Sequence, residues 1–139
     1  MLITHRTVPT YQVGEQVKKT AGRRARNKLA RKLLSEIVFP ESFQLPVKPQ
    51  FTARGLVVKD CRVMSSKKLP LLLTFESADS GDGSPRSRAS TFKVLFKIGD
   101  DVRQDQLTLQ VMRVMAKLWK RNGLNLQMSP YECVAPPTT

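Results

Sequence analysis

The sequence has very little of the side-chain chemistry on which most metal and nucleophilic catalytic sites depend. It contains one histidine, His5, and two cysteines, Cys61 and Cys133, which have neither metal-ligand spacing nor a histidine nearby. We therefore expect neither a zinc site nor a Cys-His or Ser-His catalytic pair. No stretch approaches the ~18 apolar residues of a membrane helix, and the first residues lack the apolar run of a secretory signal. These absences favour a cytoplasmic protein.

Negative charge is also scarce, and the positive excess is concentrated in one segment. The 139 residues include 24 Lys and Arg against 11 Asp and Glu, a formal net charge of +13 in a chain long enough for one domain. Residues 18–32 hold eight of the basic side chains, and alanines and leucines recur every fourth position from Ala21 to Leu33. The pattern predicts a basic amphipathic helix. It is typical of an anionic-membrane contact or of a solvated face; without interleaved aromatic residues, nucleic acid is not the expected partner.

The middle of the chain has the composition of a linker followed by strands. Pro40, Pro46 and Pro49 predict an extended linker over residues 39–54. Residues 55–64 and 68–76 have strand composition, and the four residues between Met64 and Leu69 are polar, which predicts a hairpin. Residues 77–90 are rich in Ser, Gly and Asp and predict a surface loop, and residues 91–98 alternate apolar and polar side chains as a half-buried strand does.

A long helix is predicted over residues 99–123. Asp100 or Asp101 can cap its first turn, and Gly123 supplies a stop. Its apolar stripe should be buried against the sheet, with the methionines and Trp119 in the core; the stripe consists of Leu107, Val111, Val114, Met115 and Leu118. Short strands are expected at 124–128 and 131–134. The predicted fold is α+β: an antiparallel sheet with one long packed helix, preceded by a basic helical and linker segment.

This order of elements places Lys97 at the end of the third predicted strand and an acidic residue in the first turns of the next helix. Kinase N-lobes have the same order of elements. In them a strand lysine holds the ATP phosphates, and a carboxylate from the next helix orients that lysine. On spacing alone, a solvated strand lysine is the simpler interpretation of Lys97. Asp100 suits either a helix cap or a contact of the site.

A longer string carries a specific resemblance. FKIGDDVRQDQLTLQVMRVMAKLW (96–119) closely resembles the catalytic domain of phosphatidylinositol 3- and 4-kinases, in which a Phe-Lys-x-Gly-Asp-Asp-hydrophobic-Arg-Gln-Asp run opens a helix. CRVMSSKKLPL (61–71) looks like the phosphate-binding hairpin of that family, and FPESFQLP with ESAD is similar to its class I members. The resemblance covers residues 39–133 and implies a kinase-like N-lobe over 55–139, after a linker at 39–54 and a basic segment at 1–38.

The resemblance also implies a nucleotide site. Lys97 would contact an ATP phosphate, and Asp105 would share its network with Tyr131 deep in the pocket. Ser66, at the hairpin tip, would donate to phosphate oxygens, while Met64 and Pro70 would form the roof. Leu72 falls where class I members often have a tryptophan, so one wall of the pocket would differ.

Members of this family transfer the γ-phosphate of ATP to the inositol ring of phosphoinositides, with Mg²⁺. The implied partners are a phosphoinositide membrane surface and a regulatory subunit, at a cytoplasmic location peripheral to membranes. No residue here matches the C-lobe catalytic loop or metal motif, so no catalytic or metal residue is assigned and we expect this chain alone to be inactive. Two alternatives remain open: a non-catalytic basic binding module, and a truncated isoform that competes for regulatory partners or anionic membrane.

Overall fold

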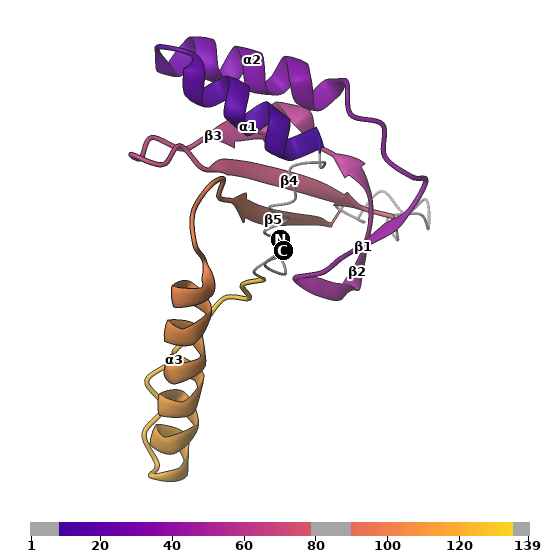
Figure 1. The fold of residues 1–139 in the computed structure, drawn as a ribbon. Helices are drawn as coiled ribbons and strands as arrows, with labels where there is room; N and C mark the ends of the chain where they lie inside the picture. Colours follow the sequence, from indigo (N-terminus) through magenta and orange to yellow (C-terminus); the bar gives the residue numbers. More distant parts are fainter. Residues whose placement is uncertain (1–8, 79–89, 135–139) are drawn as a thin grey trace.

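The computed structural model describes residues 9–78 and 90–134, which form an α+β fold as expected. Its helices are α1 (Pro9–Lys19), α2 (Arg23–Ser35), the short 3-10 helix η1 (Val58–Asp60) and α3 (Arg103–Arg121). Its strands are β1 (Phe43–Leu45), β2 (Lys48–Leu56), β3 (Arg62–Val63), β4 (Leu71–Ser77) and β5 (Thr91–Phe96). All strand pairs are antiparallel. β5 pairs with β4 along one edge, and β2 and β3 pair with different parts of the other edge of β4 (Figure 1).

Helices α1 and α2 cover one face of this sheet (Figure 1). Their inward side chains join those of β4 and β5 in one buried core, which includes Val17, Leu34, Leu71, Leu73, Phe75, Val94 and Phe96. Polar contacts fix the helices to the strands as well: the side-chain oxygen of Asn27 accepts a hydrogen bond from the Val63 amide at 2.8 Å, and Arg31 Nε donates to the Cys61 carbonyl at 3.2 Å. The helical pair and the sheet therefore form one packed body.

The basic segment forms two helices, where the sequence predicts one over this region. The chain turns at Gly22, whose φ of 83° is a left-handed conformation that glycine adopts without steric cost. Arg26 Nε donates to the Thr20 carbonyl at 2.7 Å across this turn. Ala21 and Ala25 are consequently exposed, and the buried positions of α2 are Ala30 and Leu34.

Residues 39–54 belong to the sheet, which corrects their interpretation as a linker. They form β1 and most of β2, and their three prolines lie outside the strand centre: Pro40 precedes β1, Pro46 lies in the β1–β2 turn and Pro49 is near the start of β2. Edge strands and turns tolerate proline because fewer ladder hydrogen bonds need its missing N–H. The Phe39 ring stacks on Phe43 at 5.3 Å between centroids, which ties the segment to the core.

The predicted hairpin is confirmed, although its first strand is shorter than expected. β3 pairs with β4, and the Met64 amide donates to the Pro70 carbonyl at 2.9 Å to close the connection. The first predicted strand, 55–64, is divided among the end of β2, η1 and β3. Of the predicted loop at 77–90, residues 79–89 lie outside the described residues.

The long helix is confirmed as α3, but its predicted burial is wrong. Its ends match the sequence: the Asp101 carboxylate accepts from the Arg103 amide at 3.1 Å, and Gly123 (φ 76°) ends the helix while the Leu124 amide donates to the Trp119 carbonyl at 2.9 Å. α3 projects away from the sheet (Figure 1), and Leu109 is its one buried residue. Neither α3 nor any other helix in the described ranges is both long and apolar enough to cross a bilayer.

The predicted apolar stripe of α3 is exposed rather than packed. Its members retain between 39% and 63% of their accessible surface, namely Leu107, Val111, Val114, Met115 and Leu118. Trp119 is half-buried and Met115 is exposed, so neither is a core residue. The stripe is unburied because, among residues 9–78 and 90–134, no second apolar surface lies against it.

No strand forms at 124–128 or 131–134, which corrects the last prediction about the fold. This segment instead runs back beside α3 in an irregular conformation (Figure 1). Gln106 Nε2 donates to the Cys133 carbonyl at 3.1 Å, and the Arg113 guanidinium bonds both the Tyr131 carbonyl, at 3.1 Å, and the Glu132 carboxylate, at 2.9 Å. These contacts hold the segment against α3.

Candidate functional site

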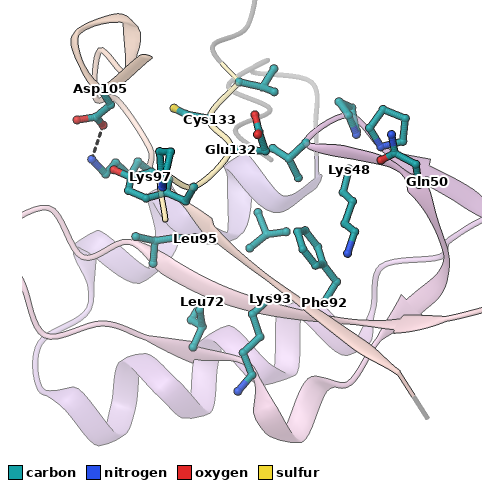
Figure 2. A pocket seen from close by; sticks show the side chains of 17 residues that line it. Lys48, Gln50, Leu72, Phe92, Lys93, Leu95, Lys97, Asp105, Glu132 and Cys133 are labelled. Carbon is teal, nitrogen blue, oxygen red and sulfur yellow. Dashed lines mark hydrogen bonds and ion pairs between the residues drawn. The ribbon is translucent and has the colours of Figure 1, made fainter. Parts of the chain in front are cut away.

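A pocket of about 880 Å³ lies on the sheet face opposite α1 and α2 (Figure 2). Leu72 of β4 and Leu95 of β5, which are partners across the two strands, form part of its apolar surface. The β1–β2 turn with the first residues of β2 (46–50), the returning segment (130–134) and Asp105 of α3 supply the remaining walls. The pocket thus collects side chains from five separate parts of the sequence.

The alternation of β5 explains why charged side chains reach this pocket. Val94 and Phe96 are buried in the core at 3% and 2% exposure, whereas Lys93 and Leu95 are exposed on the other face. Side chains of a strand alternate between its two faces, so Lys97 follows Lys93 and Leu95 toward the pocket. The half-buried strand predicted from the sequence is confirmed.

Lys97 and Asp105 form an ion pair at one end of the pocket (Figure 2). Lys97 Nζ lies 2.7 Å from Asp105 Oδ2, and the two side chains retain 27% and 34% of their accessible surface. Lys97 directly follows β5 and Asp105 lies in the first turn of α3, so the connection after β5 brings them together. The hydrogen bond that Lys97 Nζ donates to Asp105 raises the pKa of Lys97, and the charges of Asp105, Asp100 and Tyr131 act in the same direction. The ammonium is therefore charged and held in one orientation.

Tyr131 lines the same pocket, but at its exposed margin rather than deep inside as the resemblance implies. It retains 64% of its accessible surface, and it lines the pocket together with Lys97 and Asp105. Its position depends on α3, because Arg113 binds its carbonyl and the adjacent Glu132 carboxylate. Three of the six predicted site residues, Lys97, Asp105 and Tyr131, are thus brought together.

The other three predicted site residues do not line this pocket. Ser66 is exposed at the hairpin tip, where its amide donates to the Met64 carbonyl at 3.0 Å and its carbonyl accepts from the Leu69 amide at 3.0 Å. Met64 is half-buried beside Arg23 and Arg26 of α2, and Pro70 is buried. The hairpin tip still approaches the end of β5, because Lys68 Nζ lies 3.4 Å from Asp100 Oδ1. The predicted roles of the hairpin residues stay predictions.

Several pocket residues were not predicted from the sequence. Lys93 and Leu95 could have been found, since they share the strand face of Lys97 at a period of two. Lys48 belongs to residues 39–54, which the sequence predicts to be a linker. Its ammonium lies 5.1 Å from the centre of the Phe92 ring. No sequence signal identifies Arg113 as the residue that holds the returning segment.

Comparisons with known proteins bear on this site directly. Residues 91–138 match the family described as phosphatidylinositol 3- and 4-kinase. The chain is 47% identical over 125 residues to phosphatidylinositol 3-kinase 2 and 42% identical over 104 residues to phosphatidylinositol 3-kinase 1, both from Dictyostelium discoideum. These matches cover 90% and 75% of this chain. It is also 38% identical over 92 residues, 66% of its length, to phosphatidylinositol 4-phosphate 3-kinase C2 domain-containing subunit beta from Homo sapiens.

The sheet, the helices and the lysine–carboxylate pair together define a kinase-like N-lobe of the α+β class. With the matches above, the chain belongs to the phosphatidylinositol 3- and 4-kinase family. It spans about 6% of the length of the two Dictyostelium relatives. The narrower assignment to class I stays a prediction.

Members of this family are generally dependent on ATP and on a metal ion. The Lys97–Asp105 pair beside an apolar surface has the donor chemistry that suits a nucleotide phosphate. A metal site is different: residues 9–78 and 90–134 hold no group of three or more His, Cys, Asp or Glu side chains that could bind an ion. The described residues therefore do not fit Mg²⁺.

Proposed function

We propose that this chain is the nucleotide-binding lobe of a phosphatidylinositol 3-kinase, which in the complete enzyme transfers the γ-phosphate of ATP to the inositol ring of a phosphoinositide. The observation that carries the proposal is the 2.7 Å pair of Lys97 and Asp105 at one end of the pocket. The names of the similar proteins support the lipid substrate. A phosphoinositide membrane surface and a regulatory subunit as partners, and a cytoplasmic location peripheral to membranes, belong to the same proposal.

The role of Lys97 follows from its charge and its restraint. A lysine ammonium is a compact positive charge on a flexible stem, and it samples many rotamers unless a partner holds it. Asp105 fixes the ammonium beside the pocket and keeps its pKa raised. We therefore assign Lys97 to a phosphate oxygen of ATP and Asp105 to the orientation of Lys97.

The pocket walls suit the rest of a nucleotide. Leu72, Leu95 and Phe92 offer apolar surface from the sheet, and nucleotide pockets typically combine such surface with a few placed polar groups. Lys93 and Lys48 add positive charge on the same side of the sheet. The chain thus supplies a base-binding surface and a phosphate-binding end from its own residues.

The test is an ATP titration of the ¹⁵N-labelled 139-residue chain followed by two-dimensional NMR, which detects weak binding. We expect shifts at Leu72, Leu95 and Lys97. Lys97→Met should weaken ATP binding about tenfold or more, as loss of a charged hydrogen bond does. Lys117→Met is the matched control, because Lys117 is exposed on α3 and does not line the pocket.

Binding of ATP to this basic chain through charge alone would contradict the proposal. In that case the shifts would concentrate on the lysines and arginines of α1 and α2, and Lys97→Met would bind ATP as the unaltered chain does. Equal losses in Lys97→Met and Lys117→Met would contradict it as well.

A further inference from the structure

The basic side chains of residues 18–32 divide into two groups in the structure. Three are bonded to the protein: Lys18 Nζ donates to the Ile98 carbonyl at 2.8 Å, Arg26 bonds Thr20 and Arg31 bonds Cys61. The other five are exposed, and none makes a hydrogen bond or ion pair with another described residue. These five, which we call the basic face, are Lys19, Arg23, Arg24, Lys28 and Lys32.

Most of the basic face on α2 points away from the core, whereas Arg23 lies toward the β3–β4 hairpin. Arg24, Lys28 and Lys32 follow one another at intervals of four along α2 and so share one side of it. Ala30 and Leu34, the buried residues of α2, lie on the opposite side of the helix. The acidic residues nearest in sequence are Glu15 and Glu36, so no carboxylate interrupts the charge between them.

The basic face also continues toward the phosphate-binding end of the proposed site. Arg23 lines a small cavity together with Ser65 and Leu69 of the β3–β4 hairpin. Lys18, the neighbour of Lys19, bonds the carbonyl of Ile98, which directly follows Lys97. The N-terminal end of α2 therefore lies at the same end of the sheet as the Lys97–Asp105 pair, across the sheet from the pocket.

We propose that the basic face is a docking surface for an anionic lipid bilayer. Five unpaired cations without intervening carboxylates complement a negatively charged membrane, where each nearby Lys or Arg adds to the attraction. The proposal rests on the proposed function, because a kinase whose substrate is a lipid must meet a membrane.

Nucleic acid is the alternative ligand for such a surface, and the sequence disfavours it. No aromatic residue occurs between Tyr11 and Phe39, so the basic face lacks the stacking surface on which single-stranded nucleic acid binds. A bilayer needs no stacking partner, since it presents a broad field of negative charge. The basic face would place against the membrane the same end of the sheet at which the phosphates of ATP are expected to bind.

Vesicle flotation of the full 139-residue chain tests the proposal, because aggregated protein sinks and bound protein floats. The probes are vesicles of phosphatidylcholine alone and of phosphatidylcholine mixed with phosphatidylserine. We expect flotation with the mixed vesicles only, and a loss of about a hundredfold in affinity for the triple variant Arg24→Glu, Lys28→Glu, Lys32→Glu. Raising the salt from about 0.1 M to about 0.5 M should release the protein, because screening shortens the range of these interactions.

The matched control is Lys117→Glu, Lys120→Glu, Arg121→Glu on the exposed end of α3. Both triple variants replace three cations with three anions and so lower the formal net charge by six, from +13 to +7. If position matters, the control variant floats nearly as the unaltered chain does. Equal losses in the two variants would show that net charge alone drives binding and would overturn the proposal.

Two further measurements separate the possible failures. Stronger binding of the unaltered chain to single-stranded RNA than to the mixed vesicles, lost in the α2 variant, would assign the basic face to nucleic acid and overturn the proposal. The ATP-induced NMR shifts at Leu95 and Lys97 should persist in the α2 variant, since its altered residues do not line the pocket. A chain that binds ATP at the pocket but no anionic vesicle would refute the docking surface and leave the proposed function standing.

Discussion

The amphipathic helices at the two ends of the chain differ in what lies against their apolar sides. Val17 of α1 and Leu34 of α2 are exposed by 0% and 2%, whereas Leu107 and Val114 of α3 are exposed by 63% and 56%. Both regions show the spacing of apolar residues that is typical of a helix with one buried side. Such spacing predicts a helix and the side that favours burial, but it does not predict whether the same stretch of chain provides the covering surface.

The two regions also differ in how their helices are attached to the sheet. α1 and α2 are attached along their lengths, through the core and through polar contacts of Lys18, Asn27 and Arg31 with the strands. The sheet holds α3 mainly at its beginning, where Asp105 bonds Lys97 and the side chain of Val102 is buried. The rest of α3 is accompanied by the returning segment alone among the described residues.

The largest expected effect on stability comes from replacing a leucine with alanine, and the same substitution in the two regions should give very different results. Leu34→Ala should lower the free energy of unfolding by about 2–5 kcal/mol, because it opens a cavity in the core. Leu107→Ala should change it by no more than about 0.5 kcal/mol, because Leu107 is already largely in water. Urea unfolding followed by circular dichroism measures both.

Leu34→Met keeps the test usable if Leu34→Ala is already unfolded in buffer. This swap nearly conserves volume and should cost less than about 1.5 kcal/mol. A loss above about 2 kcal/mol for Leu107→Ala, growing with protein concentration, would instead mean that the apolar side of α3 is buried between copies of the chain.

A smaller effect on stability is expected from replacing glycine with alanine, which tests how tightly α1 packs on the sheet. A methyl group on Gly14 of α1 would overlap the Cδ1 atom of Ile98, which is buried at 2% exposure. Gly14→Ala should therefore cost about 1–3 kcal/mol through overpacking, although alanine favours the helix. Gly55→Ala is the control, since nothing lies within 4 Å of its added methyl. Similar thermal melting of the two variants would show that α1 is loosely placed on the sheet.

Local sequence patterns predicted most elements of the fold, because their causes are local. The alternation of residues 91–98, the polar connection of the hairpin and the capping signals of α3 at Asp101 and Gly123 are each contained within one element. The assignment of residues 39–54 to a linker failed because proline composition does not distinguish a linker from strands whose prolines lie in a turn or near a strand end. The strands expected near Leu124 and Tyr131 failed for a related reason: short apolar runs need a neighbouring strand, and the described chain offers them none.

The site was predicted where its residues are close in sequence. Lys97 and Asp105 are separated by eight residues across a strand end and a helix start, so their pairing follows from the order of the elements. Lys48 and Arg113 could not be predicted, because their positions depend on how the β1–β2 turn and the returning segment meet the sheet. Long-range arrangement of that kind leaves no pattern in a single sequence.

The smallest expected effect concerns the ion pair that joins the two regions. The folded-state pKa of Lys97 is raised, chiefly by its hydrogen bond with Asp105. The pair should therefore stabilise the fold from neutral pH up to the ordinary lysine pKa of about 10.4, and this contribution should disappear as the pH rises through the higher folded-state pKa. An NMR titration of the Lys97 side chain in the unaltered chain and in Asp105→Asn measures the shift.

Asp105→Asn keeps the shape of the side chain and removes its charge, so the pKa of Lys97 should fall toward its ordinary value. Because both side chains are partly exposed, water screens the pair, and the change in overall stability should be small. An unchanged Lys97 pKa would mean that the pair does not persist in solution and that the start of α3 is held to the sheet by the burial of Val102 instead. A lowered pKa with an unchanged unfolding midpoint near neutral pH would show that the pair orients the ammonium without contributing measurably to the attachment of α3.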